Sequence, residues 1–198
     1  LTYSKSTVSR ITQELDPQIK KWQQRQLQDY YKYLFTDAVY FYVRVDHQVV
    51  SSPVLISVAV DQSGHRKILG VDFAFEESYQ SYLNHFNKIK NRGLKYVDLT
   101  VSDDHKGLIR AQQELFSHTP HQRCICHFMR NVLSRVPYKE KEKLACYLKQ
   151  VFNSPNGEMA ATVAQMIAQK YQDSYPKVSQ ILEEELGFTL TYLDYPDH

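Results

Sequence analysis

The chain opens with apolar residues at helical spacing and continues with apolar residues at strand spacing. Val8, Ile11 and Leu15 recur every three or four residues, which predicts a helix over Leu1–Arg25. Over Asp37–Val45 apolar residues alternate with others, and most side chains are aromatic or β-branched. This pattern predicts a strand that its aspartate opens.

Two more apolar runs follow after short polar connections. They cover Pro53–Val60 and Lys67–Phe75, and Asp61–Gly64 separates them with residues typical of a tight turn. Three successive strands with short loops predict an antiparallel meander.

Beyond this meander, helical and strand patterns alternate. The predicted order is a helix over Glu76–Gly93, a strand over Tyr96–Val101, a helix over Leu108–Phe116 and a strand over Gln122–Phe128. Helical spacing continues to the end, so a block of helices is expected over Lys139–Leu190.

These elements predict an α/β fold with a mixed five-stranded sheet. Three antiparallel strands come first, and the later strands are parallel because helices of this length supply the crossovers. The order matches the ribonuclease-H-like fold, in which the first strand lies centrally beside the fourth, and a block of helices follows it here. A fold-level match of this kind says nothing by itself about chemistry.

Composition excludes several classes of protein. The 198 residues are 42% hydrophobic and 23% charged, as in a folded globular protein rather than a disordered one. No apolar run approaches the roughly 18 residues of a membrane helix, and the start lacks a signal peptide. The three cysteines favour a cytoplasmic protein with reduced thiols. Because the chain begins with Leu1, we expect it to start inside a longer gene product.

The net charge of +2 hides an uneven distribution. Residues 123–149 hold seven bases against Glu140 and Glu142, whereas residues 173–198 hold six acids against Lys177. This contrast predicts a basic face that could meet phosphate, although charged runs are also typical of solvated helix faces.

Two aspartates occupy the ends of predicted strands. Asp37 opens the first strand and Asp103 closes the fourth, so in neighbouring strands their carboxylates would meet at one edge of the sheet. Such a pair favours a divalent cation between them, and oxygen ligands suit Mg²⁺ or Mn²⁺. In the structural alternative, Asp37 caps a strand end and Asp103 caps the next helix. Asp104 competes for either role, and we assign it to the cap or the surroundings of the site.

Cysteines and histidines gather just downstream. Cys124, Cys126 and His127 could hold zinc, with His118 and His121 nearby. On a strand, however, Cys124 and Cys126 would share one face and His127 would point away. Buried cysteines are therefore favoured, with His127 donating a hydrogen bond near the carboxylates.

Three blocks of this sequence resemble those of Mutator-type transposases of bacterial insertion sequences. Tyr33–Tyr40 resembles the first catalytic strand of that family, and Val101–Leu108 resembles its second catalytic block. Gln122–Asn131 is similar to its C-x-x-H signature, here Cys124 and His127. The resemblance covers essentially the whole chain.

The resemblance implies a ribonuclease-H-like transposase with a D-D-E triad that uses Mg²⁺ or Mn²⁺. Asp37 and Asp103 would be the first two catalytic and metal-binding acids. The third acid, a glutamate, is expected beyond residue 198, and Glu183–Glu185 are not assigned that role. The residues expected around the acids are Asp104, His105, Cys124 and His127.

The resemblance also implies DNA as the partner. The enzyme would cleave the terminal inverted repeats of an element and join them to target DNA, as a homo-oligomer in the bacterial nucleoid and without a membrane. The residues expected to contact DNA are Arg123, Arg130, Arg135, Lys139, Ser6, Thr7 and Arg10.

We divide the chain into three parts. Residues 1–30 would end an N-terminal DNA-binding region, residues 31–135 would form the catalytic core, and residues 136–198 would form the helical insertion. Two alternatives stay open: a metal-dependent nuclease or resolvase on the same fold, and a non-catalytic DNA-binding remnant of a transposase.

Overall fold

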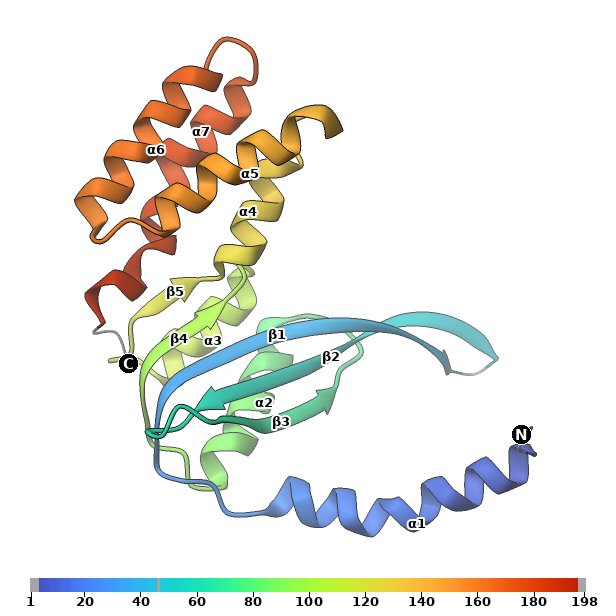
Figure 1. Cartoon of the computed structure of the whole chain (residues 1–198). Helices are drawn as coiled ribbons and strands as arrows, with labels where there is room; N and C mark the ends of the chain where they lie inside the picture. Colours follow the sequence, from blue (N-terminus) through green and yellow to red (C-terminus); the bar gives the residue numbers. More distant parts are fainter. Residues whose placement is uncertain (1–3, 46, 196–198) are drawn as a thin grey trace.

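The computed structural model describes residues 4–45 and 47–195, and a five-stranded sheet lies at its centre (Figure 1). The strand order is β3-β2-β1-β4-β5. The strands are β1 (Tyr30–Val45), β2 (Gln48–Val60), β3 (Arg66–Phe73), β4 (Tyr96–Ser102) and β5 (His121–Arg123).

The strand directions confirm the predicted fold class. β1 pairs antiparallel with β2, and β2 pairs antiparallel with β3. β1 and β4 are parallel, as are β4 and β5. The crossover helices are α2 (Tyr79–Asn91) and α3 (Lys106–Leu115). The first strand thus lies centrally beside the fourth, as expected for a ribonuclease-H-like sheet.

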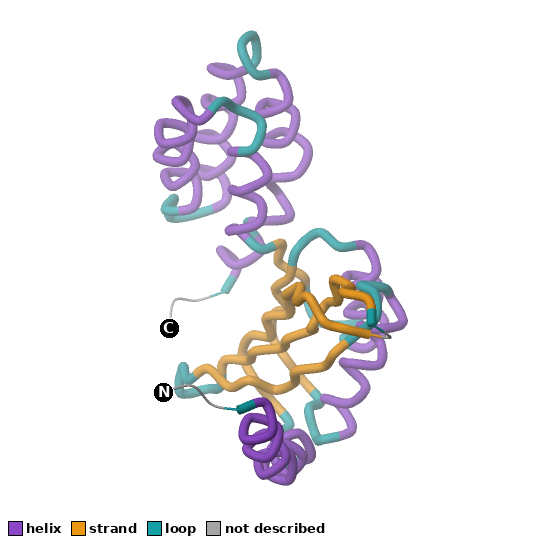
Figure 2. Tube along the Cα trace, turned by 90° about the vertical axis from the view of Figure 1, so that its right-hand side faces the viewer, coloured by secondary structure: helices purple, strands orange, loops and turns teal. Residues whose placement is uncertain are grey.

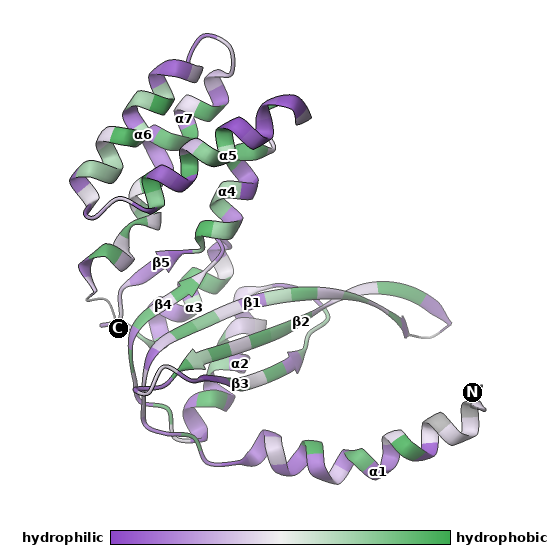
Figure 3. Cartoon of the chain, in the orientation of Figure 1, coloured by the Kyte–Doolittle hydropathy of each residue, from purple (hydrophilic) through white to green (hydrophobic). Residues whose placement is uncertain are grey.

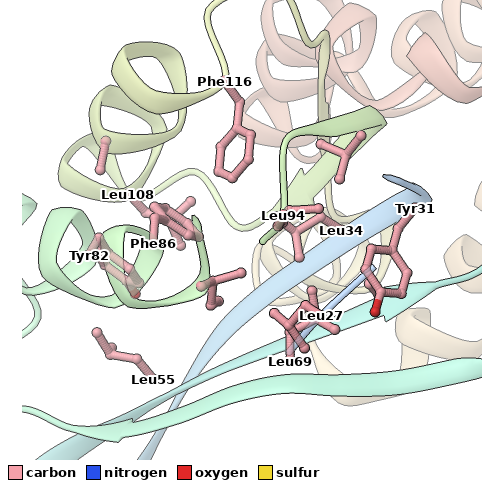
Figure 4. Close-up of a cluster of buried hydrophobic side chains, with 14 of the residues drawn as sticks. Leu27, Tyr31, Leu34, Leu55, Leu69, Tyr82, Phe86, Leu94, Leu108 and Phe116 are labelled. Atoms are coloured by element: carbon pink, nitrogen blue, oxygen red, sulfur yellow. The ribbon is translucent and has the colours of Figure 1, made fainter. Parts of the chain in front are cut away.

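Helices α2 and α3 cover one face of the sheet (Figures 1 and 2). Leu34 of β1 and Leu55 of β2 are fully buried there against Tyr82 and Phe86 of α2 (Figure 4). On the opposite face, Phe35 is substantially exposed. The sheet is therefore packed on one side and open on the other around β1.

Strand β1 begins earlier than the sequence pattern predicts. It starts at Tyr30, so Asp37 lies inside the strand and does not open it. Residues Tyr30–Thr36 pair with β4, which supplies hydrogen bonds that local alternation cannot reveal. Asp37 therefore lies directly after the last residue of β1 that pairs with β4.

The predicted strand over Gln122–Phe128 is wrong beyond Arg123. Helix α4 (Ile125–Leu133) begins there, because Phe128 and Val132 fall four residues apart on a buried helical face. The change from strand to helix redirects the side chains of the following residues, including the cysteines.

The remaining helices form a second cluster with its own core. They are α5 (Tyr138–Phe152), α6 (Gly157–Tyr171), α7 (Pro176–Glu185), and the 3-10 turns η1 (Leu186–Thr189) and η2 (Thr191–Asp194). Helix α4 also packs into this core through Phe128 and Val132. The proposed division at residue 135 stays a prediction.

Helix α1 (Lys5–Gln24) extends away from the sheet (Figure 1). Ser4 caps it by accepting a hydrogen bond from the Thr7 backbone N–H. The predicted helical residues 1–3 lie outside the described part of the chain. None of the described helices has the length and apolar character needed to cross a membrane.

Candidate catalytic site

Asp37 and Asp103 come together where the pairing of β1 with β4 ends. Thr36 and Ser102 form the last pair of this parallel ladder, and each aspartate is the next residue of its chain segment. Neighbouring strands lie about 5 Å apart. Both aspartates line one hollow of about 280 Å³, together with Cys124 and His127. The two predicted acids therefore share one site.

The alternation of β1 turns Asp37 toward the open face of the sheet. Thr36 is buried on the helix-covered face, so the next side chain projects the other way. One oxygen of Asp37 accepts a hydrogen bond from the Ala38 N–H at 2.9 Å, and one oxygen of Asp103 accepts from the Asp104 N–H at 2.8 Å. Local backbone bonds thus orient both carboxylates.

Neither Asp104 nor Asp103 caps helix α3, so the cap role suggested for each of them is wrong; the place of Asp104 in the surroundings of the site stays a prediction. His105 is the cap, and its Nδ1 accepts the Leu108 N–H at 3.2 Å. Asp104 is exposed, with one oxygen 3.6 Å from the Arg123 guanidinium. Asp103 is thus not used as the helix cap and lines the hollow.

Cys124 and His127 reach the hollow from the first turn of α4. Cys124 occupies the N-cap position, and His127 follows three residues later on the same side of the helix. Burial raises the pKa of the Cys124 thiol, against the opposing effect of backbone N–H groups of His127 and Cys126. The predicted strand geometry of the cysteines is wrong, since helix α4 begins at Ile125. The prediction of buried cysteines is wrong as well, because Cys124 is half-buried and Cys126 is exposed.

The predicted hydrogen bond from His127 is not found at Nδ1, which is buried and has no partner among the described residues. Across residues 4–45 and 47–195, no group of three or more His, Cys, Asp or Glu side chains is arranged to hold a metal ion. The zinc alternative thus finds no ligand set in this part of the chain.

Glu77 is a site residue that sequence reasoning missed. It shares a second open hollow, of about 620 Å³, with Asp103 and His105. Its carboxylate accepts hydrogen bonds from the hydroxyls of Tyr40 at 2.7 Å and Tyr82 at 2.6 Å. The bond to Glu77 raises the pKa of Tyr40, and burial raises that of Tyr82. The only signal in the sequence was its place at the start of the helix predicted over Glu76–Gly93.

The predicted DNA-binding residues fall into two groups. Arg123 is only 7% exposed, and its guanidinium pairs with Glu185 of α7 and faces Asp104. That burial leaves little surface for a phosphate, so Arg123 does not suit a phosphate contact. Arg130 lines the second hollow and is exposed. Arg135 and Lys139 follow it and are exposed as well.

The first two turns of α1 hold the other predicted contacts. Ser6 and Arg10 are exposed, and Thr7 is half-buried. The hydroxyls of Ser6 and Thr7 lie 2.9 and 2.8 Å from the Ser4 hydroxyl, within the helix cap. These residues lie near the start of α1, which extends away from the sheet (Figure 1).

A family profile described as "Transposase, Mutator family" matches residues 1–198. The chain is 36% identical over 195 residues to the transposase for insertion sequence element ISRM5 of Rhizobium meliloti, covering 98% of this chain and 49% of that protein. It is 34% identical to the transposase for insertion sequence element IS256 in transposon Tn4001 of Staphylococcus aureus, covering 89% and 45%. The chain thus spans about half the length of these relatives.

Solved structures give weaker similarities. The similarity to the Drosophila P element transposase strand transfer complex covers 94% of this chain and 57% of that chain, with 12% identity and a TM-score of 0.42. The similarity to the HTLV-2 integrase catalytic core domain in complex with magnesium covers 65% of this chain and 91% of that chain, with 14% identity and a TM-score of 0.36. The fold assignment rests on the sheet topology.

Proposed function

Because the chain belongs to the Mutator family of transposases, we propose that it provides the catalytic core of an enzyme that cleaves the ends of an insertion element and joins them to target DNA. The observation that carries this proposal is the meeting of Asp37 and Asp103 at the end of the β1–β4 ladder. The reaction is phosphodiester hydrolysis followed by transesterification.

Asp37 and Asp103 would hold a divalent ion, Mg²⁺ or Mn²⁺. The residues fit such an ion, because both offer carboxylate oxygens to one hollow and hard cations prefer oxygen ligands. A bound ion would supply Lewis-acid activation of the phosphodiester. A third carboxylate is needed to complete a D-D-E triad, and we expect it to follow the helical block in the sequence.

His105, Asp104, Cys124 and His127 would support this pair. Cys124 and His127 present the start of α4 to the same hollow, and His105 fixes the start of α3 just after Asp103. We infer that these residues hold the two helix starts, and with them the acids, in a fixed relation. They act by orientation and not by direct attack on DNA.

The DNA would approach along the exposed basic residues Arg130, Arg135 and Lys139. Arg130 of α4 lines the hollow that contains Asp103, and Arg135 and Lys139 follow it in the sequence. The start of α5 is strongly hydrophilic (Figure 3). We expect terminal inverted repeats and target DNA as substrates, and a homo-oligomer on paired ends in the bacterial nucleoid.

Conservative substitution of each acid tests the proposal in the full-length protein. Asp37→Asn and Asp103→Asn should each reduce Mg²⁺-dependent cleavage and joining of element-end DNA by at least about 100-fold, because the charge that holds the ion is lost. Asp98→Asn is the matched control: Asp98 lies on β4 but is exposed, and it should retain activity within about threefold.

Three outcomes would count against the proposal. Full activity of Asp37→Asn or Asp103→Asn would show that the substituted aspartate is not needed for catalysis. An equal loss of activity in Asp98→Asn would show that the losses come from defective folding and not from loss of a metal ligand. Cleavage without any joined product would instead support a nuclease or resolvase on the same fold.

A further inference from the structure

A row of buried hydroxyls crosses the sheet directly beneath the two carboxylates. Thr36 of β1 pairs in register with Ser57 of β2 on one side and with Ser102 of β4 on the other. Their exposures are 3%, 0% and 2%. An apolar residue would be the ordinary choice at each of these core positions. Their polarity therefore needs a reason beyond packing.

One end of this polar row is closed by an imidazole and a carboxylate. The hydroxyl of Thr36 lies 2.9 Å from that of Ser57, which lies 2.8 Å from Nε2 of His85. Nδ1 of His85 lies 2.5 Å from Asp72, which also pairs with Lys88 at the surface. The chain of hydrogen bonds thus runs from solvent to the strand that carries Asp37.

Gly70 makes room for this imidazole. It is the register partner of Ser57 on β3, and a Cβ atom added there would lie 3.0 Å from Cε1 of His85 and 3.2 Å from Ile89. A larger residue would push the ring away from Ser57. The backbone of β3 is thus adapted to the polar row.

The other end of the row is also closed by an imidazole. The Ser102 hydroxyl lies 2.8 Å from Nε2 of His121 on β5, and the Ser102 carbonyl accepts the Cys124 N–H at 2.7 Å. Ser102 therefore connects the residue before Asp103 to the strand and helix start on its far side.

The Asp72 carboxylate at the end of the row sets the donor of its bond to His85. Burial opposes ionisation of Asp72, but hydrogen bonds from His85 and Lys88 outweigh it and hold its pKa below the ordinary value. An ionised carboxylate only accepts, so Nδ1 of His85 donates to it. The Ser57 hydroxyl then bonds both Nε2 of His85 and the Thr36 hydroxyl, since a hydroxyl can donate one hydrogen bond and accept another. Every buried hydroxyl of this end is satisfied.

Ser57, His85 and Asp72 have the residue types of a hydrolytic triad, but burial excludes that role. The Ser57 side chain has no exposed surface, so no substrate can reach its oxygen. The row can act only on the strands that contain it.

We propose that Thr36, Ser57, His85 and Ser102 are positioning residues that fix the spacing of Asp37 and Asp103. The bonds of Thr36 and Ser57 anchor the end of the ladder on β1 to β2 and α2, and the bond of Ser102 to His121 anchors it on β4 to β5. Each aspartate directly follows a member of the row. Loss of the Thr36 hydroxyl leaves the fully buried Ser57 hydroxyl with one of its two hydrogen-bond partners, which favours a shift of the strand at that point. This inference rests on the proposed function, because the spacing matters only if the pair binds an ion.

The test compares two isosteric substitutions in the full-length protein. Thr36→Val removes a hydroxyl from the row. Thr100→Val removes a buried hydroxyl outside the row: Thr100 lies on the same face of β4 as Ser102 and donates to the Pro120 carbonyl. Both variants should lose similar thermal stability. Free Mn²⁺ is measured by electron paramagnetic resonance in the absence of DNA, and Mg²⁺-dependent cleavage is measured in parallel.

We expect Thr36→Val to weaken Mn²⁺ binding about 10-fold and to lower cleavage at limiting Mg²⁺ similarly, as for other residues that support metal ligands. Thr100→Val should change both by less than about twofold, and Thr36→Ser, which keeps the hydroxyl, should behave as wild type. Equal effects of the two valine variants, or no rescue by serine, would overturn the inference.

Asp37→Asn separates this inference from the proposed function. If wild-type protein binds Mn²⁺ and Asp37→Asn abolishes binding, the site is real, and the valine pair decides the role of the row. If wild-type protein neither binds Mn²⁺ nor cleaves DNA, the proposed function fails and the inference fails with it.

Discussion

Asp72 is the residue whose protonation connects most directly to stability. Its carboxylate is largely buried, accepts hydrogen bonds from His85 and Lys88, and has a pKa below its ordinary value of 3.8. A carboxylate with a lowered folded-state pKa stabilises the protein above its unfolded-state pKa. That contribution is lost as the pH falls through the folded-state value.

Asp72→Asn should therefore lower the free energy of unfolding at pH 7 by about 1–3 kcal/mol, since it weakens charge-assisted bonds to a buried imidazole. The difference from wild type should shrink as the pH falls below about 4. Urea denaturation from pH 7 to pH 3 measures both effects. Asp173→Asn, at an exposed position, is the control and should stay within about 0.5 kcal/mol. A difference that is constant with pH would contradict the assignment.

Helix α3 and its approach to α2 show how an element is placed beside the site. Gly107 lies in the first turn of α3, and a Cβ atom there would lie 2.7 Å from the backbone N of Tyr79. The two helices can therefore approach this closely only with glycine. The turn between Asp103 and α3 depends on that approach.

Gly107→Ala should destabilise the protein by about 1–3 kcal/mol, because backbone atoms must move to admit the methyl group. Gly157→Ala, at the start of α6, is the matched control: no atom lies within 4 Å of its added Cβ, and it should be neutral or slightly stabilising. Thermal and urea unfolding measure both variants. Equal unfolding free energies of the two variants would show that α2 and α3 can move apart without loss of stability.

Elements with strong local periodicity were predictable, and those that depend on distant partners were not. The helix predicted over Glu76–Gly93 exists as α2, because its apolar stripe is local. The start of β1 depends on pairing with β4, and no local pattern reports that. The end of β5 was missed because Phe128 and Val132 of α4 pack into the core of the helical block, and the local sequence does not indicate that packing.

The same distinction applies to the candidate site. Asp37 and Asp103 were identified from strand ends and family motifs, and the sheet brings them to one hollow. Glu77 was missed because its partners, Tyr40 and Tyr82, come from two other elements. The polar row was missed because serine and threonine in a strand pattern do not indicate their register partners.

At the scale of the whole molecule, Arg123 connects the sheet to the helical block. It lies on β5 and pairs with Glu185 of α7, and the neighbouring Gln122 side chain donates to the Thr189 carbonyl at 2.7 Å and accepts the Tyr192 N–H at 2.9 Å. The end of the helical block thus returns to the edge strand. This connection fixes the exposed basic residues of α4 and α5 relative to the carboxylates.

If DNA lies along that basic surface, its affinity must depend steeply on salt, because each phosphate contact releases counterions. Arg135→Gln and Lys139→Gln should each weaken binding of element-end DNA and reduce the slope of log affinity against log salt by about one. Lys177→Gln, at an exposed position of the acidic α7 segment, is the control and should change neither quantity. Filter binding or fluorescence anisotropy between 50 and 200 mM salt is a suitable measurement. Unchanged slopes in the α4–α5 variants, with a reduced slope in Lys177→Gln, would place the DNA on the opposite side of the helical block.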